Sequence, residues 1–510
     1  MFGQLTVSAL ACAGLFIGIS TDASAKAAWQ AHSGGRANDA GRGGMTQTSD
    51  DGFITVGESQ SFGNGDYDVY VVKTDLCGYV QWSAVYDIGG NDYGRKIKET
   101  PDGGFIITGM TENLNNCCAN LGVDIRPTHD AFLLKIARDG GVEWTKTYGG
   151  RRDDRGTDVE LYDGGRSGYL VSGSTASFGA GSTDGWLIAT DPAGNVNWSR
   201  TYGGAGVDAF NGLVQTASGE IVAAGYTNSY PRFDIDNGTY DIFLVRTDNL
   251  GTNIRAYHYG DDRSNEVANS VIEFMSPFSP SRNGDIVVAG YSDLAIGKGS
   301  AYLMRVSPDL ATLVTDHLYG SGDEKGLDQF RDLVQVPMTD AIFAIGSSFR
   351  PKGGFGDYDV LAMHVDDMLN KVYAHVYGGR GNDDGYGIGV DNIQGGFGWN
   401  GATTSFTFGG EDQYMGLAFS WLDTYCNESE PKLNEARPSF RPREMKVGTS
   451  LAYVECSARV GANYIRGYEL LCSTCGLDGN EEGDGSGNEL SFRSPLRAPG
   501  SATGAVAAAR

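Results

Sequence analysis

Short apolar runs alternate with turn residues along most of the chain. Between residues 95 and 148 the runs RKIKE, FIITG, AFLLKI and VEWTKTY are separated by PDGG, by a longer loop and by ARDGG. Runs of this length that are rich in β-branched and aromatic residues are typical of β-strands, and Asp-Gly and Gly-Gly are typical of hairpin turns. No unit holds a ten-residue stretch with helical periodicity. The pattern therefore predicts an all-β fold and excludes a stacked helical solenoid.

The same set of runs repeats along the sequence. A Tyr-Gly-Gly motif, or a degenerate form of it, recurs at intervals of 54 to 60 residues. Its first glycines are Gly34, Gly89, Gly149, Gly203, Gly260, Gly320 and Gly378. In every unit another glycine ends an apolar run and is followed two residues later by a hydroxyl: Ser59, Thr111, Thr175, Thr227, Ser292, Ser348 and Thr403. Four short strands per unit are typical of a propeller blade, so the repeat predicts a seven-bladed β-propeller.

The two ends of the repeat predict how the ring closes. The last unit has three strands and stops before its Trp-x-x-x-Tyr-Gly-Gly strand, whereas residues 29–35 carry the missing pattern. We therefore expect the N-terminal strand to complete blade seven, because this pairing removes an open sheet edge. The propeller is expected to span residues 26–424.

The segments on either side of the propeller have other patterns. Residues 1–25 are predicted to be a signal peptide, because the apolar run 5–19 is followed by Ala23-Ser24-Ala25, a cleavage pattern. The alternative is an uncleaved membrane anchor. No later stretch has 18 consecutive apolar residues, so no transmembrane segment is expected after signal removal. Residues 425–475 are expected to form a small, hairpin-like, Cys-containing appendage, and residues 476–510 a disordered tail.

The cysteines of an exported chain are disulfide candidates. Seven cysteines remain after signal removal, so at least one is unpaired or intermolecular. The adjacent Cys117 and Cys118 either bond to each other or pair elsewhere. Cys426, Cys456, Cys472 and Cys475 are expected to form two disulfides, with a zinc site as the alternative. The sequence does not give the connectivity.

Units such as DGGFIITGMT followed by DAFLLKIARDGGVEWTKTYGG resemble the glycine-rich β-propeller repeats of secreted and cell-surface proteins, mostly bacterial and archaeal. The resemblance covers most of the chain. It implies a seven-bladed propeller and a secreted, extracellular or cell-surface location. It implies no particular activity, because a fold alone does not supply one.

Acidic residues outnumber basic ones, and many of them repeat. The formal net charge of −25 disfavours nucleic acid as a partner. One acid precedes the first strand of most blades: Asp92, Asp154, Asp208, Glu266, Asp328 and Asp383, with Asp39 as a looser seventh. A second series begins the third strand: Asp68, Asp130, Asp184, Asp241, Asp359 and Asp412. Both series have two interpretations, acceptors of turn hydrogen bonds or ligands of calcium, which binds through oxygen atoms.

The loops of the predicted propeller divide between two faces. The D–A/B–C face carries the connections from the outer strand of one blade to the next blade and those between its second and third strands. Here A to D are the four strands of a blade, counted outward from the axis. The opposite face carries the short A–B and C–D turns, which join the first strand to the second and the third to the fourth. The longest insertions, 111–129, 226–240 and 347–357, lie on the D–A/B–C face, where binding is expected. Aromatic and cationic residues of the last two loops are the predicted ligand-binding residues: Tyr230, Arg232, Phe233, Phe349 and Arg350.

No catalytic motif is present: there is no Ser-His-Asp order, His-Glu-x-x-His or phosphate loop. The sequence therefore favours a secreted, non-catalytic binding or scaffolding protein that recognises an extracellular protein or glycan. One alternative is an extracellular lyase or hydrolase with its site at the acidic mouth of the propeller. A further alternative is a structural surface or matrix component.

Overall fold

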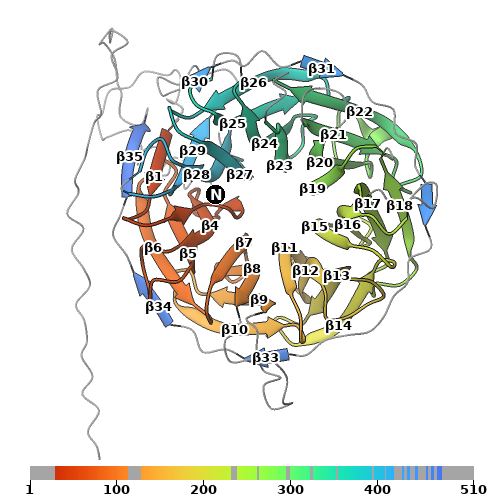
Figure 1. The fold of residues 1–510 in the computed structure, drawn as a ribbon, viewed down its shortest axis with the longest axis horizontal. Helices are drawn as coiled ribbons and strands as arrows, with labels where there is room; N and C mark the ends of the chain where they lie inside the picture. The colour runs from red at the N-terminus through yellow and green to blue at the C-terminus, as the bar shows by residue number, and fades with distance from the viewer. Residues whose placement is uncertain are drawn as a thin grey trace, which may run out of the picture.

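In the computed structural model, seven antiparallel sheets stand like blades around a central axis (Figure 1). The structure describes residues 29–112, 128–230, 238–260, 263–293, 299–321, 326–351, 354–392, 395–407, 409–418 and six short strands between residues 428 and 473. The fold is a seven-bladed β-propeller, as the repeat predicts. The predicted signal peptide, residues 1–25, and the predicted tail, residues 476–510, lie outside the described residues. No helix in the described part of the chain is long and apolar enough to cross a membrane.

Each blade has four main strands, A to D, counted from the axis outward; in blade one, β2 and β3 share the innermost position. The strands of blades one to four are β2 (Asp39–Ala40), β3 (Met45–Gln47), β4 (Phe53–Ser59), β5 (Asp68–Thr74) and β6 (Val80–Asp87); β7 (Asp92–Glu99), β8 (Phe105–Glu112), β9 (His129–Ile136) and β10 (Val142–Tyr148); β11 (Asp154–Tyr162), β12 (Gly168–Thr175), β13 (Asp184–Thr190) and β14 (Val196–Tyr202); β15 (Asp208–Gln215), β16 (Ile221–Thr227), β17 (Asp241–Thr247) and β18 (Arg255–Tyr259). The strands of blades five to seven are β19 (Glu266–Glu273), β20 (Ile286–Ser292), β21 (Ser300–Val306) and β22 (Leu313–Gly320); β23 (Gln329–Gln335), β24 (Ile342–Phe349), β25 (Tyr358–Val365) and β26 (Lys371–Tyr377); β27 (Asp383–Val390), β28 (Phe397–Thr403), β29 (Asp412–Ala418) and β1 (Trp29–Ser33). Between β19 and β20 lies one 3₁₀ turn, η2 (Pro280–Arg282).

The N-terminal strand closes the ring, as the sequence predicts. β1 pairs antiparallel with β29, with Trp29 opposite Leu417 and Ser33 opposite Gln413. Trp29 is buried, and its indole nitrogen donates a hydrogen bond of 2.9 Å to the Leu76 carbonyl of blade one. The first described strand therefore joins blade seven to blade one.

The segment after the propeller runs around the outside of the ring. Its strands are β30 (Glu428–Ser429), β31 (Asn434–Ala436), β32 (Arg443–Met445), β33 (Glu455–Ser457), β34 (Gly461–Tyr464) and β35 (Tyr468–Ser473). They pair, in that order, with the outer strands of blades six, five, four, two, one and seven (Figure 1). We call these six strands the outer belt.

The outer belt corrects the expectation of a hairpin-like appendage. Its strands pair with the blades and not with one another. The physical reason is that every outer strand has one edge of unpaired backbone groups, which an added strand can satisfy. Cys456 in β33 and Cys472 in β35 accordingly lie on the edges of different blades, two and seven. Cys117, Cys118, Cys426 and Cys475 lie outside the described residues.

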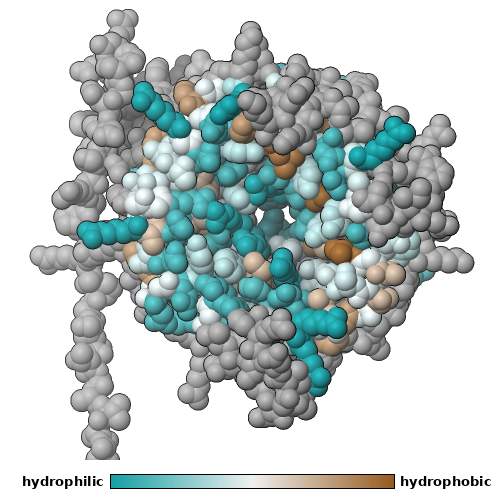
Figure 2. Space-filling view, in the orientation of Figure 1, coloured by the Kyte–Doolittle hydropathy of each residue, from teal (hydrophilic) through white to brown (hydrophobic). Residues whose placement is uncertain are grey.

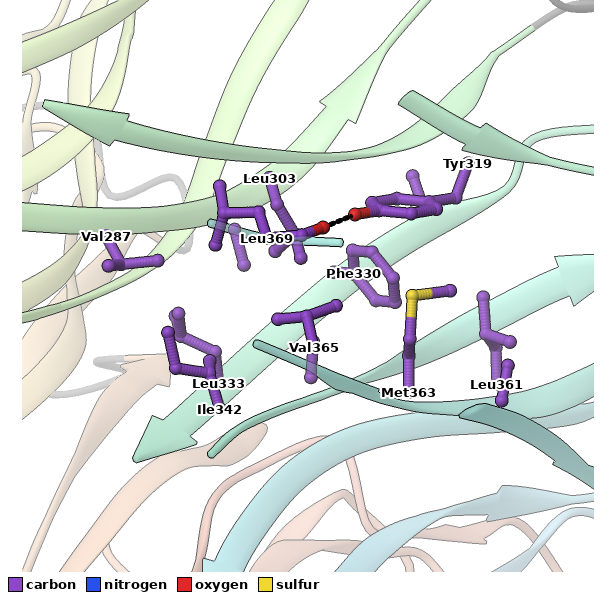
Figure 3. Close-up of a cluster of buried hydrophobic side chains, with 14 of the residues drawn as sticks. Val287, Leu303, Tyr319, Phe330, Leu333, Ile342, Leu361, Met363, Val365 and Leu369 are labelled. Atoms are coloured by element: carbon purple, nitrogen blue, oxygen red, sulfur yellow. Dashed lines mark hydrogen bonds between the residues drawn. The ribbon is translucent and has the colours of Figure 1, made fainter. Parts of the chain in front are cut away.

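Apolar side chains fill the spaces between neighbouring blades. One such cluster joins blades five and six through Leu303, Phe330 and Met363 (Figure 3). The tyrosine of the repeat motif lies in these interfaces. Its hydroxyl donates to a turn carbonyl of the following blade, as Tyr148 does to Gly194 at 2.7 Å. The Tyr-Gly-Gly motif is therefore a joint between blades.

Candidate functional site

The repeated acids at the start of the first strands are buried and hydrogen-bonded. Asp208 accepts bonds from the Ser229 hydroxyl at 2.6 Å and the Gly204 backbone at 2.8 Å, and also from Thr227. Asp383 accepts the equivalent bonds from Ser405 and Gly379. Burial raises the pKa of Asp208, and these hydrogen bonds partly oppose that effect. Hydroxyl groups of the repeated series, such as that of Thr227, thus donate hydrogen bonds to these carboxylates.

The candidate metal ligands Asp92, Asp154, Asp208, Glu266, Asp328 and Asp383 each lie at a different junction between blades, so the structure does not gather them into one site. At most junctions the acid of the following blade faces the third-strand acid of the preceding blade across the first glycine of the motif. A β-carbon at Gly149 would stand 2.1 Å from Asp130 Oδ1 and 3.0 Å from Asp154 Oδ2. A side chain at this position would therefore collide with both carboxylates. The other glycines held between two acids are Gly34, Gly203, Gly260 and Gly378.

The junction between blades one and two carries an aspartate where the other junctions have this glycine. Asp87 directly follows Tyr86, whose hydroxyl bonds to the Gly140 carbonyl as Tyr148 bonds to Gly194. Ile88 then donates its backbone N–H to Asp92, as Gly150 does to Asp154. The repeat pattern suggested Gly89 as the motif glycine of this junction, and the structure places Asp87 there instead. The signal was the constant spacing of six residues from tyrosine to acid in blades one, two and three.

One carboxylate oxygen of each of Asp68, Asp87 and Asp92 lies within 4.8 Å of the other two. Burial, together with Asp87 and Asp66, raises the pKa of Asp68 to about 7, although the Asn64 backbone opposes the shift. Burial also raises the pKa of Asp92 to about 7, and the backbone N–H groups of Ile88 and Gly89 oppose the shift. The side-chain amide of Asn64 donates to Asp87 Oδ2 at 2.6 Å.

The predicted ligand-binding residues are only partly within the described chain. Tyr230 is half-buried, and a β-carbon at Gly204 would stand 3.2 Å from its ring. Phe62, Phe178 and Phe406 have the same relation to the second motif glycines Gly35, Gly150 and Gly379. Tyr230 is therefore a repeated packing residue. Arg232 and Phe233 lie outside the described residues.

The other two predicted residues lie in blade six. Phe349 is 9 % exposed and packs edge-on against Tyr358, with the ring centroids 4.9 Å apart. Arg350 is exposed, and its guanidinium forms an ion pair of 2.6 Å with Asp357. The structure thus leaves Arg350 on the surface and uses Phe349 for packing.

A polar cavity of about 260 Å³ lies in the central channel, between the innermost strands. Residues from the innermost strands of all seven blades line it, among them Gln47, Lys96, Asp158, Leu213, Ser270, Asp332 and Ile388. Lys96 pairs with Asp332 at 2.9 Å, and Lys98 with Glu160 at 2.6 Å. Burial raises the pKa of Asp158 to about 6, although Lys96 opposes the shift. On the face shown in Figure 2, hydrophilic residues predominate around the central opening.

A second cavity, of about 410 Å³, adjoins the channel on the face of the A–B turns. Its lining is Val214, Ile272, Glu273, Met275, Val334, Gln335, Pro337 and Met338, which come from blades four, five and six. We call this cavity and its lining the A–B mouth. Met275 and Met338 are 43 % and 71 % exposed, and Phe278, which follows Met275 on the same connection, is 73 % exposed.

The A–B mouth was missed by the sequence analysis, which described this face as terse turns. The connection of blade five, residues 274–285, is longer than its counterpart in blade two, residues 100–104. It is fixed to blade six, because Gln335 and the Met275 backbone exchange two hydrogen bonds of 2.9 Å. The signal was the segment SPFSPSRNG, an insertion with an exposed aromatic residue.

No family model matches the sequence. The chain is 26 % identical over 173 residues to the regulatory protein FlaEY of Caulobacter vibrioides. That alignment covers 31 % of this chain and only 18 % of the length of the relative.

Among solved structures, the chain is similar to a protein of unknown function from Dyadobacter fermentans, with 11 % identity and a TM-score of 0.40 over 77 % of this chain and 98 % of that one. It is also similar to Sqt1 from Chaetomium thermophilum, with 9 % identity and a TM-score of 0.38 over 73 % and 81 %. A puromycin hydrolase aligns with 14 % identity and a TM-score of 0.35 over 73 % and 51 %. At these scores the likenesses carry no argument about function.

Proposed function

We propose that this chain is an exported, non-catalytic binding protein that recognises a protein partner at the A–B mouth. One observation carries the proposal: Met275 and Met338 are exposed in the lining of a cavity that adjoins the channel, and Phe278 is exposed on the same A–B connection as Met275. Exposed apolar side chains that gather beside a cavity are typical of interaction sites. Export rests on the apolar run 5–19 and the cleavage pattern after it.

The chemistry of the A–B mouth favours a protein over a glycan. Thioether and phenyl groups give apolar contacts, and methionine adapts its shape to different partners. They offer little to the hydroxyl groups of a sugar. Since Glu273 lies in the lining and the chain is strongly acidic, we expect the partner to present an apolar side chain beside basic residues.

The D–A/B–C face offers less in the described residues. Arg350 is paired with Asp357, and Phe349 is buried. The alternative of a lyase or hydrolase is also less favoured, because the two lysines of the channel are paired with carboxylates of other blades: Lys96 with Asp332 of blade six and Lys98 with Glu160 of blade three. Such pairs stabilise the ring.

The test compares two sets of variants. Met275→Ser, Phe278→Ser and Met338→Ser are combined in one protein, and Phe355→Ser, which changes an exposed aromatic residue on the opposite face, is the matched control. Each protein is immobilised and exposed to the secreted and envelope fractions of the source cells, and captured proteins are quantified by mass spectrometry. We expect the triple variant to lose a partner that the wild type and the control both retain.

The melting temperature of both variants should stay close to that of the wild type, because all four side chains are exposed. If the triple variant captures the same proteins as the wild type, the A–B mouth is not the recognition site. Loss of capture in the Phe355→Ser control alone would place recognition on the D–A/B–C face instead.

A further inference from the structure

The junction between blades one and two has an excess of negative charge. Asp87 brings a third carboxylate to Asp68 and Asp92, at a position that is glycine at the six other junctions. Two of the three are almost fully enclosed: Asp68 is 1 % exposed and Asp92 is 0 % exposed. Like charges at such short range repel one another strongly when water is excluded.

At two other junctions, a histidine forms a hydrogen bond with the third-strand acid. Asp412 accepts a hydrogen bond of 2.9 Å from His32, and Asp241 one of 2.5 Å from His258. At the junction of blades one and two, no described lysine, arginine or histidine forms an ion pair with any of the three aspartates.

Two of the three carboxylates each have a buried oxygen without a donor. Asp68 Oδ2 and Asp92 Oδ1 receive no hydrogen bond from the described part of the chain. Asp92 Oδ2, in contrast, accepts the backbone N–H groups of Ile88 at 2.6 Å and Gly89 at 3.1 Å. A buried carboxylate oxygen without a donor is costly, and a cation would satisfy it.

We propose that Asp68, Asp87 and Asp92 bind one hard divalent cation, calcium, between blades one and two. All three ligands are carboxylate oxygens, which calcium prefers, and the cluster has no nitrogen or sulfur ligand of the kind that zinc favours. Oxygens within 4.8 Å of one another can share an ion, since calcium–oxygen distances are about 2.3–2.6 Å. The site is independent of the A–B mouth, which lies on the opposite face.

The sequence itself supplies the decisive variant. Asp87→Gly restores the residue found at the six other junctions, so the backbone is expected to accept it. Asp87→Asn is the second variant and keeps the size of the side chain. Asp66→Asn is the matched control, because it removes the same charge from an exposed residue of the adjacent loop that is outside the cluster.

Binding is measured on the full chain by calorimetric titration with calcium chloride. A second readout is terbium luminescence excited through Tyr67 and Tyr93, which flank the ligands and lie 5.5 Å apart. We expect one ion per wild-type chain, an affinity reduced at least about 30-fold in both Asp87 variants, and a change below about 3-fold in Asp66→Asn.

The proposal is overturned if the wild type shows no saturable binding up to about 5 mM calcium, a concentration above the range of extracellular calcium modules. It is equally overturned if Asp87→Gly and Asp87→Asn bind as the wild type does. The melting temperature in chelator checks that the variants are folded, and the asparagine variant decides the question if the glycine variant is not.

Discussion

At the scale of single residues, buried polar groups determine how neighbouring blades fit together. Five motif tyrosines each join one blade to a turn of the next, and first-strand acids such as Asp208 accept hydrogen bonds from hydroxyl and backbone donors. The glycine between two carboxylates is required by space, because a β-carbon would meet both. The repeated residues therefore build junctions, and each has a local physical reason for its identity.

The buried carboxylates make the stability of the ring depend on pH. Burial raises the pKa of Asp359 to about 6, and Asp383 adds to the shift. A folded state with a raised carboxyl pKa binds protons that the unfolded chain releases, so stability is full below about pH 4 and falls as the pH rises towards 7. In chelator, we expect the wild type to melt several degrees lower at pH 7.5 than at pH 4.5.

Asp359→Asn isolates this contribution, because the amide is neutral and can still accept the backbone N–H groups of Phe355 and Gly356. The variant should melt above the wild type at pH 7.5, and the difference should vanish near pH 4. The assignment fails if the two proteins show parallel melting curves over the whole pH range.

Most of the repeated buried residues could be predicted from the sequence, and Asp87 is the exception. The hydroxyl and acid series were visible as repeats, although only the structure shows that they bond to each other. Asp87 was missed because the neighbouring Gly89 and Gly90 imitate the motif. A residue that replaces a required glycine is found by counting positions from the tyrosine. Strand pairing fixes the number of residues between the tyrosine and the acid, but it does not fix the residue types.

At the scale of elements, the strands of the blades were predictable and the outer belt was not. Blade strands pair with their chain neighbours, so period and turn chemistry identify them. The belt strands have only two to six residues and pair with partners far away in the sequence. Backbone pairing of this kind leaves little trace in side-chain pattern, whereas cysteines in the same segment suggested a compact unit.

Two deletions separate the roles of the N-terminal strand and the outer belt. Removing residues 26–36 takes away β1, which pairs with β29 on one side and β35 on the other and buries Trp29. Removing residues 428–510 takes away the belt but leaves four strands in every blade, the arrangement described for blade three. We expect the first deletion to prevent closure and cause aggregation, and the second to leave a folded ring with exposed edges.

Light scattering after gel filtration and thermal unfolding distinguish the two outcomes. The belt deletion should melt cooperatively at a lower temperature than the full chain and should self-associate. If it remains monomeric with an unchanged melting temperature, the belt does not protect the edges. A stable monomer after the β1 deletion would contradict the role of β1 in closure.

At the scale of the whole molecule, a ring of seven similar blades offers every partner seven similar surfaces. Selection therefore depends on the places where the symmetry is broken. Two such places in the described structure are the three carboxylates between blades one and two and the A–B mouth of blades four to six. The three carboxylates suit a bound cation, and the A–B mouth suits an apolar side chain of a partner protein.

The central claim of this account is that the partner docks at the A–B mouth. Hydrogen–deuterium exchange of the chain, alone and with the captured partner, tests it most directly. The account predicts slower exchange in the complex for the amides of residues 274–285 and 336–341, and no change for residues 350–357 on the opposite face. Protection confined to residues 350–357, with the A–B connections unchanged, would contradict it.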